Sequence, residues 1–266
     1  MTSVSNTIKK IVDSRRTTKK RDLEYFNSIK KNISSNRATL SEKIKKKEGT
    51  SIISEIKPKS PTMGNIRTKM DVKSVVKEME KAGVIGLSVL TEPNYFGGSY
   101  ENLQIAVEST RLPCLMKDFI IDEIQLKIAK AIGATNVLLI NSIIDISIFY
   151  PLCLKYDLEP LIEIHKIGEI SDIEHLTELG FEPKLIGVNN RNLRTLKVIL
   201  QNSLEIIPKL KEQLGTEQLI ISESGIETHE DIQLIKSTGA DAFLIGSSIM
   251  KSNNIREKIL ELRGHK

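Results

Sequence analysis

The sequence predicts a closed α/β barrel of eight parallel strands, preceded by a short helical segment. From residue 51 onward a short apolar run recurs eight times, and helix-like amphipathic segments lie between the runs. Strictly alternating strands and helices predict a parallel sheet, and eight such units predict closure into a barrel. The length of 266 residues fits a (β/α)8 barrel, or TIM barrel, which typically needs about 250. No G-x-G-x-x-G motif follows the first run, which disfavours a doubly wound sheet.

The expected strands are short and aliphatic, in keeping with an aromatic content of only 4%. They cover residues 51–56, 84–90, 114–117, 136–140, 160–164, 185–188, 218–222 and 242–245. Helix starts are indicated by Asp71, Asp122 and Thr228, which are residue types that cap the first turn. Helix ends are indicated by glycines, which adopt the left-handed conformation easily: Gly83, Gly133, Gly180 and Gly239.

Residues 1–48 fall outside the repeat, and we expect a helical extension that packs on the barrel of residues 49–266. Residues 1–50 hold 14 Lys/Arg and 5 Asp/Glu, a net charge of +9, whereas residues 51–266 hold 25 and 29, a net charge of −4. Apolar residues such as Ile8, Val12 and Phe26 recur in the basic segment at helical spacing. Because no aromatic platform accompanies the charge, an amphipathic helix with a solvated basic face is favoured over a nucleic-acid-binding arm.

Other classes of protein are disfavoured by what the sequence lacks. No stretch reaches the roughly 18 apolar residues of a membrane-spanning helix, and the N-terminus lacks the apolar core of a secretory signal. Cys114 and Cys153 are too few for a disulfide framework. No Walker sequence, H-E-x-x-H motif or Cys/His cluster with metal spacing is present, so we predict no metal site. A cytoplasmic protein is expected.

Polar residues stand at the ends of several expected strands, where this architecture places its active site. Residues two apart in a strand share a face, so these side chains should converge over the mouth of the barrel. His165 also follows a strand, but a lone His near a helix start is more often a cap, and it is left out. A ring of salt bridges that merely closes the barrel is the alternative interpretation. The converging residues are Glu55, Lys57, Lys117, Glu163, Asn189 and Arg191.

The ends of the last two expected strands carry small residues typical of a phosphate site. Ser224 and Gly225 follow the strand 218–222, and Gly246 and Ser247 follow the strand 242–245. Glycine allows backbone N–H groups to approach an anion, and in this fold phosphate usually binds at these two loops. Either pair alone carries little information, because Ser and Gly mark turns everywhere.

These residues and their surroundings resemble the indole-3-glycerol phosphate synthase family of tryptophan biosynthesis. The segments that carry the resemblance occur in the family's order along the whole barrel: SEIKPKSP, LTEPNYFGGS, LMKDFIID, LIEIH, IGVNNRNL, ISESGI and AFLIGSSIM. The stretch PTMGNI departs from the family's usual turn, outside the expected catalytic positions. The resemblance implies a carboxy-lyase that closes an indole ring on a sugar phosphate, with loss of carbon dioxide and water, and without a cofactor.

The resemblance also implies roles for single residues. Lys117 would be the general acid of ring closure, Glu163 the base, and Lys57 a second acid or a partner of a substrate anion. Glu55 would hold the lysines, and the two lysines together would lower each other's pKa. Asn189 would bind a sugar oxygen.

Further contacts to the substrate are implied in the same way. Arg191 would meet the carboxylate of the anthranilate, and two aromatic side chains would form a slot for its ring. The N-terminal segment is expected on the top rim, where its charge would attract an anionic substrate. The remaining substrate contacts are Ser60, Phe96, Phe119, Glu223, Gly225, Gly246 and Ser247, with Ser224 counted among the catalytic residues.

Two alternatives remain at this point. Phosphoribosylanthranilate isomerase is a sister barrel, but it has a Cys at the end of its first strand, where this chain has Glu55 and Lys57. A non-catalytic phosphate-binding barrel would tolerate loss of one acid–base residue, and none is missing here. The expected partner is a small sugar phosphate, with no nucleic acid and no membrane, on a monomer or weak homo-oligomer.

Overall fold

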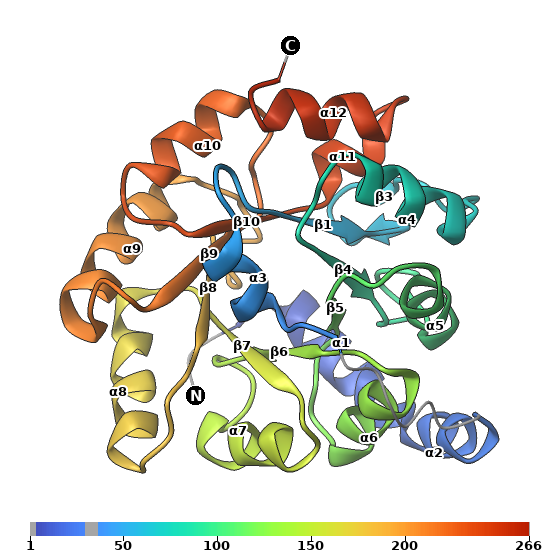
Figure 1. The fold of residues 1–266 in the computed structure, drawn as a ribbon. Helices are drawn as coiled ribbons and strands as arrows, with labels where there is room; N and C mark the ends of the chain where they lie inside the picture. Colours follow the sequence, from blue (N-terminus) through green and yellow to red (C-terminus); the bar gives the residue numbers. More distant parts are fainter. Residues whose placement is uncertain (1–3, 30–36, 266) are drawn as a thin grey trace.

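Eight parallel strands close into a barrel in the computed structural model, which describes residues 4–29 and 37–265. Each strand pairs with its neighbour in the sequence, and the first pairs with the last, Ile52 opposite Phe243 (Figure 1). The predicted barrel is therefore confirmed, and every expected strand overlaps an observed one. The barrel strands are β1 (Ile52–Ile56), β4 (Gly86–Leu90), β5 (Cys114–Lys117), β6 (Asn136–Ile140), β7 (Glu159–Ile164), β8 (Leu185–Asn189), β9 (Leu219–Glu223) and β10 (Ala242–Ile245).

Helices follow the strands and form the outer ring (Figure 1). The three predicted start residues, Asp71, Asp122 and Thr228, each accept a backbone N–H of the first turn through the side chain. Gly133 ends its helix at a φ of 99°, which is the left-handed conformation expected of it. The helices of the ring are α4 (Val72–Lys81), α5 (Tyr100–Ser109), α6 (Glu123–Ile132), α7 (Ile146–Lys155), α8 (Ile170–Glu178) after the short η1 (Ile167–Glu169), α9 (Gln201–Leu214), α10 (His229–Lys236), α11 (Ser247–Lys251) and α12 (Ile255–Leu262).

The core consists of two layers because side chains of a strand alternate between its faces. Ile52 and Ile56 of β1 belong to the layer between strands and helices, whereas Ile53 belongs to the layer inside the barrel. The inner layer is largely aliphatic, with Leu115 and Leu138 among its fully or almost fully buried members. The barrel is thus a packed core, and only its ends can hold polar chemistry.

The helix α3 (Leu40–Lys46) closes the end of the barrel where the strands begin, and it lies at the front of Figure 1. Leu40 is fully buried within the inner layer. Its backbone N–H donates to Asn136 Oδ1 at 3.2 Å, and that of Ser41 donates to Glu159 Oε2 at 3.1 Å. The polar residues that open β6 and β7 therefore satisfy the first turn of α3.

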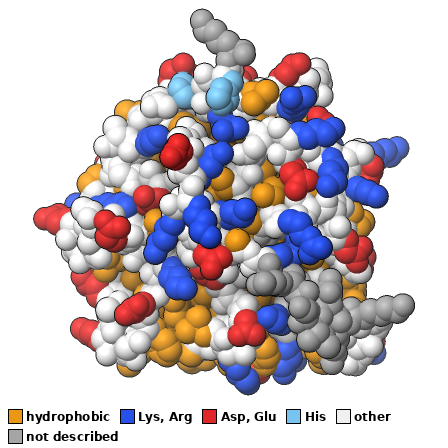
Figure 2. All heavy atoms as spheres, in the orientation of Figure 1, with side chains coloured by type: hydrophobic (Ala, Val, Ile, Leu, Met, Phe, Trp, Pro, Cys, Tyr) orange, Lys and Arg blue, Asp and Glu red, His pale blue; other side chains and the backbone are white. Residues whose placement is uncertain are grey.

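The helix α1 (Asn6–Thr17) is held at the opposite end of the barrel, and α2 (Lys19–Ser28) packs beside α6 of the outer ring. The Ser5 N–H donates to the Leu193 carbonyl at 2.9 Å, and Asn94 Nδ2 donates to Ser14 Oγ at 2.7 Å, both in loops that follow strands. The expected position on the top rim is therefore right for α1. The expectation is wrong for α3, whose lysines lie at the end of the barrel where the strands begin. Figure 2 views this end and shows Lys and Arg side chains gathered there.

The loop after β1 contains a hairpin that the sequence does not predict, because each of its strands is only two residues long. Its strands are β2 (Lys59–Ser60) and β3 (Gly64–Asn65). The Lys59 N–H donates to the Phe96 carbonyl at 3.1 Å, which ties this loop to the one after β4. Within the described part of the chain, none of the helices has the length and apolarity needed to cross a membrane.

Candidate active site

Lys117, at the end of β5, stands at the centre of the barrel mouth. Its Nζ lies 3.5 Å from Glu163 Oε2 on β7 and 4.0 Å from Glu55 Oε2 on β1, and it donates a short hydrogen bond to Glu223 Oε2 on β9. Side chains of all four residues are at least 85% buried. Three carboxylates from three strands therefore surround one ammonium group, as the strand-end argument predicts.

Glu55 also pairs with Lys57, whose Nζ lies 3.0 Å from Glu55 Oε1. Gly246 makes room for this carboxylate, because a Cβ on Gly246 would lie 2.5 Å from Glu55 Oε1 and 2.9 Å from Glu55 Cβ. Gly187 does the same for Glu223, whose Oε1 a Cβ at position 187 would contact. Two glycines thus create the space in which the acidic side chains fit.

The pKa of Lys117 is raised, which corrects the expectation that a neighbouring lysine would lower it. Burial lowers this pKa, but the negative charges of Glu223, Glu163 and Glu55 raise it by more. Lys57 contacts Glu55, so its charge is largely compensated before it reaches Lys117. Lys117 is therefore held as an ammonium ion that can donate hydrogen bonds.

The two glutamates beside Lys117 have opposite pKa shifts. The pKa of Glu223 is raised to about 8, because burial and the charge of Glu163 raise it by more than Lys117 lowers it. Burial also raises the pKa of Glu163, but Lys117 and His165 outweigh this and hold it well below its usual range. Carboxyl groups whose pKa values are pushed apart in one site are typical of acid–base catalysis.

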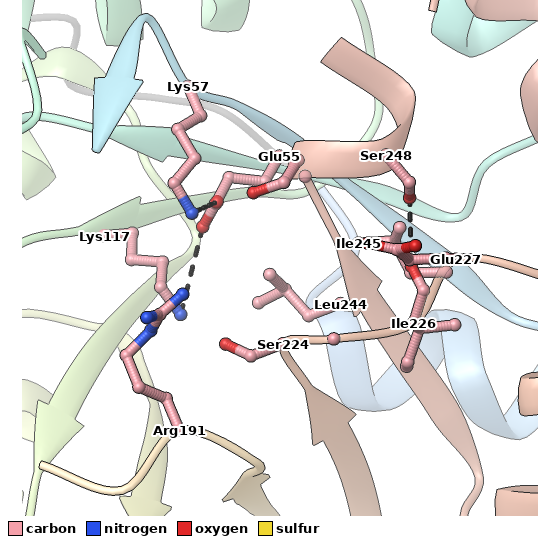
Figure 3. Close-up of a pocket in the computed structure, with 13 residues that line it drawn as sticks. Glu55, Lys57, Lys117, Arg191, Ser224, Ile226, Glu227, Leu244, Ile245 and Ser248 are labelled. Atoms are coloured by element: carbon pink, nitrogen blue, oxygen red, sulfur yellow. Dashed lines mark hydrogen bonds and ion pairs between the residues drawn. The ribbon is translucent and has the colours of Figure 1, made fainter. Parts of the chain in front are cut away.

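Asn189 and Arg191, at the end of β8, complete the polar wall. Asn189 Nδ2 donates to Glu163 Oε2 at 2.9 Å, and Asn189 Oδ1 accepts the Arg191 N–H at 2.9 Å. Arg191 Nη1 donates to the Leu196 carbonyl at 2.9 Å. Figure 3 shows Arg191, Lys117 and Lys57 pointing toward Glu55 from different strand ends. Positive groups therefore face the open part of the mouth.

A small pocket opens between these cations and the loops after β9 and β10 (Figure 3). Ser224 and Gly225 have φ values of 70° and 82°, so two consecutive residues are left-handed in the first loop. For Ser224 this conformation carries strain, which is commonly found at functional sites. Gly246 and Ser247 line the second loop. All four are residues predicted from the sequence to bind phosphate, and the pocket brings them together.

A second, more apolar pocket adjoins the first and shares five of its lining residues: Glu55, Lys57, Lys117, Arg191 and Ser224. Its far wall contains Phe96 and Phe119, whose ring centroids are 6.0 Å apart, together with Ile8 of α1. Glu92 shapes the loop that carries Phe96, because its carboxylate accepts the N–H of Phe96 at 2.9 Å. The mouth therefore combines an anion pocket, a group of acids and bases, and a slot lined by aromatic rings.

Comparison with known proteins identifies the family of this barrel. The model of the indole-3-glycerol phosphate synthase family matches residues 2–262. The chain belongs to the indole-3-glycerol phosphate synthase family. An indole-3-glycerol phosphate synthase of Methanocaldococcus jannaschii is 46% identical over 215 residues, 79% of this chain and 76% of that protein. One from Geobacillus is 36% identical over 249 residues, 92% of this chain and 93% of that protein.

Solved structures share the fold at low identity. A thiamine phosphate pyrophosphorylase from Pyrococcus furiosus has a TM-score of 0.60 at 18% identity, over 85% of this chain and 96% of that one. A 3-hexulose-6-phosphate synthase has a TM-score of 0.62 at 14% identity, over 81% of this chain and 99% of that one. At these identities the likeness concerns the barrel alone.

Two residues predicted as substrate contacts of the indole-3-glycerol phosphate synthase family line neither pocket. Ser60 is buried, and its hydroxyl accepts the N–H of Met63 at 3.1 Å, so it shapes its own loop. Glu223 is fully buried behind Lys117. The other twelve predicted site residues line one pocket or both. Within the described residues, no group of His, Cys, Asp and Glu side chains could hold a metal ion.

His165, which was left out of the predicted site, contacts the site residue Glu163 although it lines neither pocket. Its Nε2 lies 3.1 Å from Glu163 Oε1, and its side chain is 6% exposed. Glu169 Oε2 accepts the His165 N–H at 2.7 Å and fixes the backbone there. His165 stands two residues after Glu163, the same spacing that predicts the paired residues at other strand ends. This spacing is the signal in the sequence that indicates its contact with Glu163.

Proposed function

We propose that this chain converts 1-(2-carboxyphenylamino)-1-deoxyribulose 5-phosphate into indole-3-glycerol phosphate. The observation that carries the proposal is the position of Lys117, which borders both the anion pocket and the aromatic slot while three carboxylates hold it. A substrate with its phosphate in one pocket and its anthranilate ring in the other would lay its keto carbon across Lys117. Family membership supports the same reaction.

Charge in the mouth suits an anionic substrate. Around Lys117 the mouth holds three cations and three carboxyl groups, and Glu227 and Asp118 also line its pockets. The pKa of Glu223 is raised to about 8, which reduces the negative charge beside Lys117 near neutral pH and favours binding of an anion. The cations are Lys57, Lys117 and Arg191, and the carboxyl groups around them are Glu55, Glu163 and Glu223.

The binding roles follow from the pocket walls. The phosphate would accept hydrogen bonds from the loops after β9 and β10, where Ser224, Gly225, Gly246 and Ser247 lie. The ring would pack against Phe96 and Phe119, and its carboxylate would face the cations beside them. Asn189, which already donates to Glu163, would bind a sugar oxygen. Ser60 stays a prediction as a substrate contact.

The reaction moves protons but requires no net oxidation or reduction. An aromatic carbon attacks the keto carbon while Lys117 donates a proton to the carbonyl oxygen. Carbon dioxide then leaves with its bonding electrons returned to the ring, and water leaves with a proton from a second acid, for which Lys57 is placed. Glu163, held ionised, takes the proton released as the indole forms. Protonated Glu223 can return a proton to Lys117.

The test is the appearance of indole fluorescence when the purified protein meets this substrate without any cofactor. Lys117→Met should reduce turnover by about 10²-fold or more while substrate still binds, because the acid acts mainly in the transition state. Lys127→Met removes a partly exposed lysine of α6 and serves as the matched control. Substrate binding without product in the unaltered protein would instead identify a non-catalytic phosphate-binding barrel. Near-normal turnover of the Lys117 variant would exclude Lys117 as the acid.

A further inference from the structure

A buried ion cluster lies just beyond the end of β5, outside both pockets except for one of its members. At its centre is Arg15 of α1, which is 2% exposed although it belongs to the basic segment of the sequence. Its Nη2 donates to Asp22 Oδ2 at 3.1 Å and to the Tyr100 hydroxyl at 2.9 Å. Its Nε lies 3.1 Å from Asp118 Oδ1, an ion pair. One guanidinium thus joins α1, α2, α5 and the residue that follows β5.

Asp118 connects this cluster to the active site, because it follows Lys117 directly and precedes Phe119. Its Oδ1 accepts the Phe119 N–H at 2.8 Å, and its Oδ2 accepts the Thr91 hydroxyl at 2.7 Å. The Thr91 N–H in turn donates to the Lys117 carbonyl at 3.0 Å. The Asp118 carboxylate therefore holds the backbone of Phe119 directly and that of Lys117 through Thr91.

Ionised Asp118 depends on Arg15. The titratable groups around it are Arg15 from α1, Asp22 from α2, Tyr100 from α5 and Glu92 from the loop after β4. The pKa of Asp118 is raised to about 6, because burial and Glu92 raise it by more than Arg15 and the Thr91 hydroxyl lower it. Without Arg15 the carboxylate would be buried with no cation beside it and would take up a proton instead.

We propose that Arg15 is a positioning residue for the reaction: it holds Asp118, and through it the turn that places Lys117 and Phe119 at the mouth. This inference rests on the proposed function for its kinetic readout only. The N-terminal segment would then contribute to catalysis through a buried arginine, which is a different role from that of its exposed basic residues. A protonated Asp118 would use one carboxyl oxygen as a hydrogen-bond donor. The Phe119 N–H and the Thr91 hydroxyl would then compete for its remaining acceptor oxygen.

The experiment compares Arg15→Met with Arg16→Met. Arg16 is the adjacent residue of the same helix, and its side chain is 69% exposed in an ion pair with Asp13, so the control removes the same charge without touching the cluster. In Arg15→Met we expect kcat to fall about 10- to 100-fold with a much smaller change in KM, because groups about an ångström out of place lose that much rate. The acid limb of the kcat profile should move to higher pH, by about one unit or more.

Arg15→Lys should return the acid limb to its original position, since it restores a charge beside Asp118. It should restore kcat only in part, because one ammonium group cannot span Asp118, Asp22 and Tyr100 as the guanidinium does. Asp118→Asn leaves Arg15 paired with Asp22 and mimics the protonated state. It should reproduce the loss of kcat, and adding Arg15→Met to it should cost little more. This variant also tests the link if Arg15→Met does not fold.

A readout that needs no turnover separates this inference from the proposed function. Acetic anhydride modifies free lysine amines, and the modification of Lys117 can be followed by peptide mass spectrometry. Lys117 should react several-fold faster in Arg15→Met or Asp118→Asn than in the unaltered protein or Arg16→Met, because a loosened turn exposes it. If the unaltered protein makes no indole, the proposed function fails and this rate still decides the role of Arg15. Equal rates, or a loss of kcat without a shift in pH profile, would overturn the positioning role.

Discussion

Gly246→Ala should damage catalysis through Glu55. A Cβ at this position would lie 2.5 Å from Glu55 Oε1, 2.9 Å from its Cβ and 3.1 Å from its Cδ. Since non-bonded heavy atoms prefer about 3.5 Å, Glu55 would have to retreat by roughly 0.5–1 Å along its whole side chain. The φ of Gly246 is −122°, outside the left-handed region that favours glycine, so we attribute the effect to the lack of space.

Displacing Glu55 by that amount would pull it from Lys57, now 3.0 Å away, and alter the charge around Lys117. We expect kcat to fall about 10²-fold, as misplacement by about an ångström can cost, and the free energy of unfolding to fall by about 1–3 kcal/mol from overpacking. Gly168→Ala is the control, because nothing lies within 4 Å of a Cβ at that position. The assay is indole fluorescence at saturating substrate, beside urea unfolding.

The result also distinguishes the two parts that Gly246 could play. If it served only the phosphate, KM would rise and kcat would stay. In a Glu55→Gly background all three crowding atoms are gone, so adding Gly246→Ala should have almost no further effect on kcat. A kcat in Gly246→Ala equal to that of the Gly168 control would refute the reasoning.

Two further predictions concern the glutamates beside Lys117. Glu163→Gln should lower turnover about 10²-fold without lowering the melting temperature much, because the amide keeps the size of the side chain but cannot take a proton; a matching loss of stability would mark a structural ion pair instead. The pKa of Glu223 is raised from 4.5 to about 8, so the folded protein keeps a proton that the unfolded chain releases within this window. Stability should therefore fall as pH rises between these values, by at most about 1.4 kcal/mol per pH unit, and Glu223→Gln should remove that slope in urea unfolding. An unchanged slope in the variant would contradict the raised pKa.

The positions of the site residues could be predicted because they depend on strand geometry, which a sequence expresses directly. Glu55 and Lys57, or Asn189 and Arg191, share a face of their strand end whatever the details of packing. The start of α6 at Asp122 and its end at Gly133 are equally local properties. Each of these features requires only near neighbours in the chain.

What the sequence could not predict depends on contacts between distant residues. The raised pKa of Lys117 results from carboxylates on three other strands, whereas the sequence only indicates that another lysine is near. The basic residues of the N-terminal segment are expected on a solvated face because helical periodicity separates apolar from charged residues. The burial of Arg15 departs from this pattern, and it depends on partners far along the chain, such as Asp118. His165 is left out of the predicted site because a lone histidine near a helix start is more often a cap. Its spacing of two residues from Glu163 places it on the same face of the strand end, where it contacts Glu163.

The N-terminal segment contacts both ends of the barrel, so its docking during synthesis depends on residues that are made much later. Residues 4–29 and 37–46 leave the ribosome before any strand, yet their partners come much later: Ser41 bonds to Glu159, 118 positions away, and Ser5 to Leu193. Closing such long loops is costly in entropy until the intervening strands have paired. The first helices made thus depend on residues made much later, and a nascent chain can possess β1, β4, β5 and β6 before the partners of Ser41 and Ser5 have been synthesised.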